Sequence, residues 1–279
     1  MKEKLAAVFI ITRPLNFLIT FISVIVAVII CLPQDYSELN ILIAAIAAAL
    51  TTASGNIIND IYDIEIDKIN RPQRPLPSEI ISIKEAYILY FLFTTISIIL
   101  SIWLNLSAIS IVLFAHFLLF LYSKYLKQIP LVGNITVAFL TGLVFIFGGV
   151  VVENPSAAIL PCIFAFLINL IREIVKDMQD IEGDKQSGLL TFPIKFGILK
   201  TKLIISFFTF ILLIFTFYPF IAQLYKIEFF VIVMVSVNPV MIYVIKKIYE
   251  KDYVKNLKKI SILLKLSMIS GLIAIYLGA

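Results

Sequence analysis

Two short acidic segments of this chain carry the same pattern of charges. The first reads Asp60-Ile-Tyr-Asp63-Ile-Glu65-Ile-Asp67-Lys68, and the second, 117 positions later, reads Asp177-Met-Gln-Asp180-Ile-Glu182-Gly-Asp184-Lys185. On a helix that advances about 100° per residue, the three aspartates of each segment lie within an arc of roughly 60°, with the glutamate on the opposite side. The spacing therefore predicts two clusters of three carboxylates, each aimed in one direction.

Such clusters suit the binding of a hard divalent cation. Mg²⁺ takes oxygen ligands and is commonly held by one or two carboxylates together with substrate phosphates. If the two clusters converge across a cavity, they can hold two or three such ions, and the natural anionic partner is a diphosphate. We therefore expect the metal site to consist of Asp60, Asp63, Asp67, Asp177, Asp180 and Asp184.

Basic residues stand beside both clusters. Arg offers a fork that matches phosphate oxygens, and Lys offers a point charge. The flanking residues expected to contact the anion are Lys68, Arg71, Arg74, Arg172, Lys176 and Lys185. The alternative is that they only mark a cytoplasmic face or contact lipid headgroups. Three prolines within residues 72–77 predict a stiff, extended strap that presents Arg71 and Arg74, although a simple helix stop would use the same prolines.

The composition is that of an integral membrane protein. Of the 279 residues, 61% are hydrophobic and only 15% are charged. One aspartate in a bilayer core costs about 3 kcal/mol on insertion scales, so six must face water, cations or one another. No Gly- or Pro-rich linker divides the chain, and we expect a single domain over residues 1–279, with a possible diverged internal repeat that carries the motifs at 59–67 and 177–184.

Nine apolar stretches are long enough to span a bilayer, which predicts an all-α, polytopic bundle of nine transmembrane helices. They cover residues 14–33, 39–62, 84–104, 107–124, 130–152, 157–177, 202–224, 227–247 and 257–278. The connections on one side hold 21 of the 23 basic residues, and the exceptions are Lys226 and Lys265. By the positive-inside rule the N-terminus is cytoplasmic and the C-terminus is outside. The longer polar connections, 64–83 and 178–201, are on the same side, so we expect a central cavity that opens to the cytoplasm.

These residues resemble the UbiA-type intramembrane prenyltransferase superfamily. Its first motif, Asn-Asp-x-x-Asp-x-x-x-Asp, reads here as Asn59-Asp60-Ile-Tyr-Asp63-Ile-Glu-Ile-Asp67, followed by Asn70-Arg71-Pro72-Gln-Arg74-Pro75. Its second motif, Asp-x-x-Asp-x-x-x-Asp, reads here as Asp177-Met-Gln-Asp180-Ile-Glu-Gly-Asp184. Further similar segments are Arg13-Pro14-Leu15-Asn16, Tyr122-Ser123, Leu126-Lys127 and Gly133-Asn134.

The resemblance implies nine helices around a cavity and Mg²⁺-dependent transfer of a prenyl group from a prenyl diphosphate. It implies that the six aspartates hold the Mg²⁺–diphosphate, that Asn59 supports this catalytic site, and that Arg71, Arg74, Lys127 and Lys185 contact phosphate oxygens. It also places Arg13, Asn16 and Tyr122 among the substrate-binding residues.

Within the family, the segment from Arg172 to Lys185 looks most like an archaeal branch that makes ether lipids. That likeness implies geranylgeranyl diphosphate as donor, the sn-2 hydroxyl of geranylgeranylglyceryl phosphate as acceptor, and membrane lipid as the surroundings. Other branches prenylate aromatic acids for quinone synthesis or esterify a tetrapyrrole. A different class, a cation-coupled transporter, would also use intramembrane carboxylates. We expect no nucleic-acid partner.

Overall fold

The computed structural model describes residues 2–32 and 37–279, and within them it contains helices, turns and loops but no strand. Nine helical segments of this described part are long and apolar enough to cross a membrane. They are Pro14–Cys31, Glu38–Tyr62, Ile83–Ile102, Leu106–Lys124, Val132–Val151, Pro155–Gln179, Ile198–Ile221, Ile227–Ile248 and Tyr253–Gly278. The prediction of an all-α, multi-pass membrane protein is confirmed. Pro33, the predicted end of the first span, lies outside the described residues.

The chain divides into two compact units, which are described separately. The first unit consists of Met1–Gln128, Leu143–Ala158 and Glu182–Leu189, and the second of Ile129–Gly142, Ile159–Ile181 and Leu190–Ala279. The expectation of a single domain stays a prediction.

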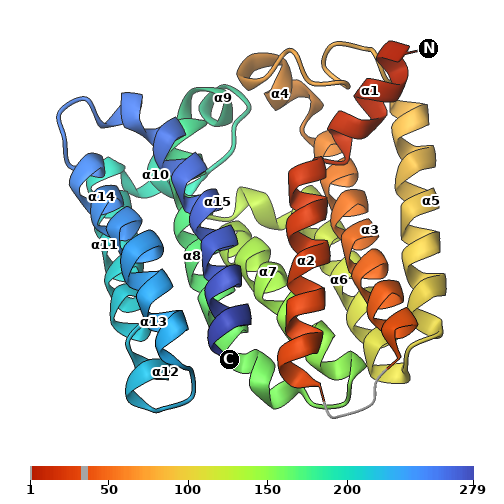
Figure 1. Cartoon of the computed structure of the whole chain (residues 1–279). Coiled ribbons are helices and arrows are strands. Elements are labelled where there is room, and N and C mark those ends of the chain that lie inside the picture. The colour runs from red at the N-terminus through yellow and green to blue at the C-terminus, as the bar shows by residue number, and fades with distance from the viewer. Residues whose placement is uncertain (1, 33–36) are drawn as a thin grey trace. The chain divides into compact units, whose positions relative to one another are not determined.

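The first unit is built around α3 (Glu38–Tyr62), the helix that leads into the first aspartate motif. It packs against α2 (Pro14–Cys31), α5 (Ile83–Ile102) and α6 (Leu106–Lys124) (Figure 1). Its buried face is rich in small residues, among them Ala45, Ala49 and Gly55. A Cβ atom at Gly55 would come within 2.7 Å of the Leu119 side chain, so this glycine permits the close approach of α3 and α6.

A buried histidine ties these helices together. His116 on α6 lies 2.7 Å from Ser97 Oγ on α5 and 3.4 Å from Ser54 Oγ on α3. These three side chains are all buried, and hydrogen bonds between them satisfy polar groups that would otherwise be costly inside a membrane span. His116 is therefore a packed, hydrogen-bonded residue, as its apolar sequence neighbours suggest.

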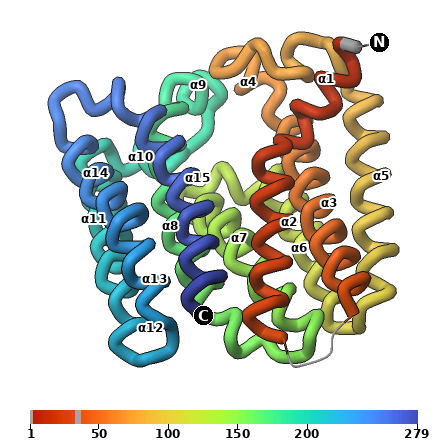
Figure 2. Tube along the Cα trace, in the orientation of Figure 1, coloured from red at the N-terminus to blue at the C-terminus, as the bar shows by residue number. Residues whose placement is uncertain are grey.

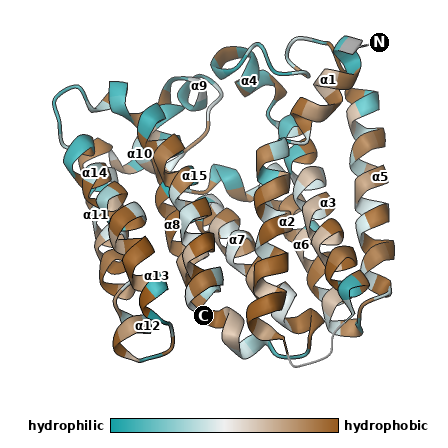
Figure 3. Ribbon diagram, in the orientation of Figure 1, coloured by the Kyte–Doolittle hydropathy of each residue, from teal (hydrophilic) through white to brown (hydrophobic). Residues whose placement is uncertain are grey.

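One end of the first unit carries the elements that surround the aspartate motif. Here α1 (Lys2–Ile11), α4 (Ile64–Asn70) and the first turn of α5 lie at the same end of the unit (Figure 2). A buried apolar cluster joins α1, the end of α3, the segment after α4 and the start of α5, and consists of Ala7, Ile11, Ile57, Ile58, Ile61, Leu76, Ile81 and Ala86. Hydrophilic residues gather at this same end, while the spans below it are mostly apolar (Figure 3). The aspartate motif of this unit thus lies at its hydrophilic end.

The second unit packs α8 (Ile159–Gln179) against α11 (Ile198–Phe215) and α15 (Tyr253–Gly278), and α15 also packs against α13 (Ile227–Ile232) and α14 (Asn238–Ile248). Between α13 and α14, Val233–Val237 form a π-helical turn, η3, immediately before Asn238 and Pro239. A proline removes one backbone donor, and a wider turn is one way for a helix to accommodate that loss. Asn238 Nδ2 donates to Thr216 Oγ1 at 3.1 Å, which ties this turn to the end of α11.

The main departures from the predicted elements are short helices in the connections. α1, α4, α9 (Ile181–Gln186), α10 (Phe192–Phe196) and α12 (Tyr218–Ile221) are all too short to span a bilayer. The seventh span was predicted to continue to residue 224, but α11 ends at Phe215 and the chain turns before α12. Pro219 in the first turn of α12 fits this break, because proline is tolerated at a helix start and disrupts a helix interior. The remaining described elements are α7 (Val132–Val151) and the short 3₁₀ turns η1 (Leu126–Gln128) and η2 (Pro155–Ala158).

Candidate active site

The first aspartate motif is divided by a kink. α3 ends at Tyr62, Asp63 has φ −98° and ψ 6°, and α4 begins at Ile64. The backbone hydrogen bonds continue through the junction, from Asp63 N to Asn59 O at 2.9 Å and from Asp67 N to Asp63 O at 2.7 Å. The single helical face predicted from the spacing is therefore wrong in detail. Asp is a poor residue for a helix interior, because its side chain competes with the backbone for hydrogen bonds.

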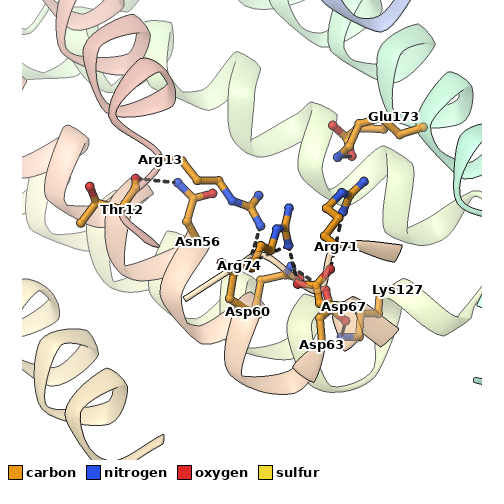
Figure 4. A network of polar contacts seen from close by, with 12 residues as sticks. Thr12, Arg13, Asn56, Asp60, Asp63, Asp67, Arg71, Arg74, Lys127 and Glu173 are labelled. Atoms are coloured by element: carbon orange, nitrogen blue, oxygen red, sulfur yellow. Dashed lines mark hydrogen bonds and ion pairs between the residues drawn. The ribbon is translucent and has the colours of Figure 1, made fainter. Parts of the chain in front are cut away.

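Asp60 and Asp67 nevertheless point toward the same cation (Figure 4). Arg74 Nη1 lies 3.2 Å from Asp60 Oδ1 and 2.5 Å from Asp67 Oδ2. Arg71 Nη1 lies 3.7 Å from Asp67 Oδ1. Two carboxylates seven residues apart, on different helices, thus converge on one guanidinium group.

Asp63 has different partners. Lys127, on η1, forms a salt bridge through its ammonium group with Asp63 Oδ1. Asn59 Nδ2 donates to Asp63 Oδ2 at 2.7 Å. The other amide atom, Asn59 Oδ1, is buried and meets no hydrogen-bond donor within residues 2–32 and 37–279. An unsatisfied buried acceptor is costly, so this oxygen is suited to accept a bond from a ligand or its hydration shell.

Arg13 reaches the site from the junction of α1 and α2. Its guanidinium group forms a salt bridge with Asp60, and its backbone is left-handed, with φ 52° and ψ 72°. Such a conformation is strained for a residue with a side chain. Asn56 Nδ2 donates to the carbonyl oxygen of Thr12 at 3.3 Å (Figure 4). This hydrogen bond holds the residue that precedes Arg13. Sequence reasoning missed Asn56, although it stands one helical turn before Asp60.

The carboxylates at this site are largely removed from solvent. Asp60 is 4% exposed and Asp67 is 2% exposed. Burial raises the pKa of Asp67, and the charge of Arg74 opposes that rise. For Arg13, burial is the largest single influence and lowers the pKa, but the charge and hydrogen bond of Asp60, together with the charges of Asp67 and Asp63, outweigh it, and the pKa lies above its ordinary value. Arg13 therefore keeps its positive charge beside the buried carboxylate of Asp60.

The segment that carries Arg71 and Arg74 is compact. We expected an extended strap, but residues 71–81 form successive turns, with backbone hydrogen bonds from Arg74 N to Arg71 O and from Ser78 N to Arg74 O, both 3.0 Å. Leu76 and Ile81 are buried in the apolar cluster that includes Ala7 and Ile57. The expectation of an extended strap is wrong, because burial of these two side chains folds the segment back onto α1 and α3.

The second motif repeats the local geometry of the first. α8 ends at Gln179, Asp180 occupies the junction, and α9 begins at Ile181. Asp177, in the last turn of α8, accepts a hydrogen bond of 2.9 Å from Asn134 Nδ2 on α7. The order of long helix, junction aspartate and short helix is thus the same in both motifs, with Asp63 and Asp180 in equivalent places.

Asp184 lies in the first unit, together with α4. It is 7% exposed and belongs to α9. The neighbouring Gly183 faces the side chain of Asn70 at the end of α4, and a Cβ atom at Gly183 would overlap that side chain. A larger residue would require the Asn70 side chain to move, so Gly183, which stands where the first motif has Ile66, favours this approach of α9 to α4. The third aspartate of the second motif is thereby brought beside the short helix that carries Asp67.

A buried glutamate joins the basic residues of α8. Glu173 is 6% exposed, and it accepts hydrogen bonds from Arg172 Nη1 at 2.9 Å and from Lys176 Nζ at 2.8 Å. Sequence reasoning singled out Arg172 and Lys176 but missed Glu173. The sequence feature that could have identified Glu173 is an acidic residue inside an apolar span, within one helical turn of two basic residues.

The remaining predicted substrate-binding residues have less specific surroundings. Lys68 is exposed and pairs with Glu65 at 2.7 Å, an arrangement typical of a solvated helix face. Lys185 is exposed on α9, whereas Asn16 on α2 and Tyr122 on α6 are half-buried. The roles expected for these four residues stay predictions.

The donor atoms of the first motif fit a hard cation. Carboxylate oxygens are the ligands that Mg²⁺ prefers, and in this structure they contact guanidinium and ammonium nitrogens of the protein. Among the residues that the structure describes, no three acidic, histidine or cysteine side chains are arranged so that they could hold a metal ion. Any metal would therefore share these oxygens with Arg13, Arg74 and Lys127 or displace them.

Comparison with known proteins identifies a family. The profile described as the UbiA prenyltransferase family matches residues 20–269. The digeranylgeranylglyceryl phosphate synthase of Methanosphaera stadtmanae is 34% identical over 269 residues, which cover 96% of this chain and 97% of the relative. The protein of the same name from Methanocaldococcus jannaschii is 33% identical over 281 residues, which cover 99% of this chain and 97% of the relative.

Solved structures share the fold. A structure described as digeranylgeranylglyceryl phosphate synthase in membranes has a TM-score of 0.74 and 32% identity, and the match covers 98% of both chains. A UbiA homolog from Archaeoglobus fulgidus bound to DMAPP and Mg²⁺ has a TM-score of 0.70 and 19% identity, with 96% of this chain and 98% of that chain covered. At that identity, the second likeness supports the fold alone.

Proposed function

Because this chain belongs to the UbiA prenyltransferase family and is a prenyltransferase, we propose that it transfers a geranylgeranyl group to a lipid acceptor. The proposed donor is geranylgeranyl diphosphate, and the proposed acceptor is the sn-2 hydroxyl of geranylgeranylglyceryl phosphate. The product is a phosphorylated glycerol with two ether-linked chains. The transporter alternative is set aside by the family assignment.

The contact that carries the donor assignment is the convergence of Asp60 and Asp67 on Arg74. We propose that all six motif aspartates serve a Mg²⁺–diphosphate site, with Arg13, Arg71, Arg74 and Lys127 as phosphate partners. When bound, Mg²⁺ would neutralise charge that builds on the departing diphosphate. Buried cationic side chains do the same in a site of low dielectric, where each contact is stronger than in water.

Stabilisation of the leaving diphosphate and exclusion of water together allow the prenyl group to be transferred. The allylic C–O bond of the donor breaks, and its electron pair leaves with the diphosphate. The acceptor oxygen forms a new C–O bond to the resulting allylic cation, and the hydroxyl proton is released. Arg13 and Arg74 hold the leaving group, while the apolar spans keep water from the cation.

The acceptor assignment is supported by relatives that match along nearly their whole length. Two proteins named digeranylgeranylglyceryl phosphate synthase each cover at least 96% of this chain. A phosphorylated acceptor also needs cationic partners of its own, and Arg172 and Lys176 on α8 can supply them. We further propose that the N-terminus and the motif end of each unit face the cytoplasm, with the reaction cavity open to that side.

The test measures which of three acceptors the protein prenylates. The purified protein receives geranylgeranyl diphosphate with geranylgeranylglyceryl phosphate, 4-hydroxybenzoate or 1,4-dihydroxy-2-naphthoate in parallel, and mass spectrometry identifies the products. We expect product only from the lipid phosphate. Product only from an aromatic acid would overturn the acceptor assignment and favour a role in quinone synthesis.

A further inference from the structure

Glu173 is a buried carboxylate that the proposed chemistry does not use. It lies one helical turn before Asp177 in a membrane-spanning helix, where an isolated charge would be costly. Its two carboxylate oxygens are engaged separately: Oε1 accepts from Arg172 Nη1 at 2.9 Å, and Oε2 accepts from Lys176 Nζ at 2.8 Å. A single acidic side chain thus holds two cationic groups at fixed positions.

The contact with Arg172 is unusual for neighbours on a helix. Residues at i and i+1 do not face each other, whereas residues at i and i+3 do. Lys176 therefore reaches Glu173 along the helix surface, but Arg172 must turn its side chain around the helix to make its contact. Both Arg172 and Lys176 remain mostly covered, with side chains 18% and 27% exposed. The three residues form a compact, largely buried cluster.

The helix that carries this cluster is fixed in rotation. Asn169 Nδ2 donates to Thr141 Oγ1 at 2.9 Å, and Asn134 Nδ2 donates to Asp177 Oδ2 at 2.9 Å. Beyond the Asn169 contact, toward the start of α8, Gly142 lies against the backbone of Cys162, where a Cβ atom would approach the carbonyl oxygen to 2.8 Å. Two hydrogen bonds and one close approach hold α8 against α7. The face with Asn169, Glu173 and Asp177 therefore cannot turn without breaking them.

From this arrangement we infer that Glu173 is a positioning residue for recognition of the acceptor's phosphate group. It holds Arg172 and Lys176 in positions from which their cationic groups can bind a phosphate monoester without first being ordered. Long basic side chains lose rotamer freedom when they bind, and holding them in advance reduces that loss. Glu173 also balances one of the two positive charges while no phosphate is bound. This inference rests on the proposed function, because it assumes a phosphorylated acceptor.

The experiment compares two acceptors that differ only in the phosphate: geranylgeranylglyceryl phosphate and geranylgeranylglycerol. Glu173→Gln keeps the size of the side chain but leaves one carbonyl oxygen in place of two charged oxygens. In the variant we expect KM for the phosphorylated acceptor to rise about tenfold, with kcat and KM for the donor changed by less than about twofold. The value of kcat/KM for geranylgeranylglycerol should be unchanged.

Two further variants sharpen the comparison. Glu173→Asp retains the charge on a shorter side chain and should restore part of the affinity for the phosphorylated acceptor; it also serves as the test if Glu173→Gln does not fold in detergent. Glu250→Gln is the matched control, because Glu250 also binds a lysine, Lys247, at 2.7 Å, but its side chain is 38% exposed and it lies just after the end of α14. We expect this control to leave both acceptors unaffected.

Equal losses with both acceptors would overturn the inference, because a purely structural role of Glu173 does not distinguish them. An unchanged KM for the phosphorylated acceptor in both Glu173 variants would overturn it as well. Failure of the proposed function looks different: the wild-type protein itself would then make no product from the phosphorylated lipid.

Discussion

Asp60 and Asp67, seven residues apart and on different helices, each accept a hydrogen bond from the same nitrogen, Nη1 of Arg74, at 3.2 and 2.5 Å. The kink at Asp63 changes the direction of the chain between them, and the turns of residues 71–81 bring Arg74 back to both carboxylates. This shared contact joins the first aspartate motif and the downstream segment of residues 70–75 into one site.

Arg74→Gln should disable the binding of the donor. The variant leaves Asp60 and Asp67 without their shared guanidinium and removes a bidentate partner for the diphosphate. We expect kcat/KM for geranylgeranyl diphosphate to fall by at least about a hundredfold, with the fold retained. Steady-state kinetics measure the loss. Lys84→Gln, an exposed charge at the start of α5, is the control and should behave as the wild type. Equal activity of the two variants would contradict the role given to Arg74.

Metal and diphosphate should bind cooperatively. Arg13, Arg74 and Lys127 occupy the carboxylate oxygens that a divalent cation needs, and a diphosphate offers these side chains new partners. We expect Mn²⁺ or Mg²⁺ alone to bind weakly in isothermal titration calorimetry, and to bind about tenfold or more tightly when inorganic diphosphate is present. In Arg74→Gln, the affinity for the metal alone should rise and the cooperativity should shrink. Metal affinity that is tight and independent of diphosphate would rule out this exchange of partners.

The Lys127–Asp63 pair should contribute to stability. Both side chains are mostly buried, at 10% and 17% exposed. Lys127→Met leaves the Asp63 charge with Asn59 as its neutral partner, and loss of one member of a buried pair costs about 3 kcal/mol. We expect a lower melting temperature in detergent for Lys127→Met, and partial recovery in the double variant Asp63→Asn/Lys127→Met. A double variant less stable than Lys127→Met would show that the charge on Asp63 is stabilised by other groups.

Labelling of single cysteines should establish the orientation of the chain. Gln73 is exposed at the motif end of the first unit, and Ser156 is exposed in the loop near the far end of α2. With Cys31 and Cys162 replaced by alanine, an impermeant maleimide added to intact cells should label Ser156→Cys but not Gln73→Cys. Labelling of both positions after the membrane is opened is the control. The reverse pattern in intact cells would place the motifs outside.

The sequence was sufficient to predict the spans and the motif residues because each depends on a local property. Apolar length defines the spans, and a charge pattern within nine residues defines the motifs. Contacts that depend on tertiary structure could not be predicted in this way. The left-handed backbone of Arg13 follows from the junction of two helices, and the compact turns around Arg74 follow from burial of Leu76 and Ile81.

Burial explains the other residues that sequence reasoning missed. Glu173 and Asn56 do not belong to either aspartate motif. Glu173 is a single acidic residue between basic neighbours, and Asn56 is a single amide before the first motif. Their importance comes from what surrounds them: two cations around a carboxylate in α8, and the Thr12 carbonyl beside α3. The packing of α1 and α2 against α3 reveals the contact of Asn56, whereas the contacts of Glu173 lie within α8 and leave a local signal in the sequence.

We propose that the aspartate motifs promote ionisation of a prenyl diphosphate with the help of a divalent cation. The most direct measurement is the simultaneous yield of two-chain lipid phosphate and inorganic diphosphate from purified protein, with Mg²⁺ and after its removal by EDTA. We expect the two products in equal amounts with Mg²⁺, neither after EDTA, and recovery when Mg²⁺ is restored. Asp63→Ala and Asp180→Ala should each lower the yield by orders of magnitude while the protein remains folded in detergent. Full product formation by the metal-free protein, or by either aspartate variant, would contradict the account.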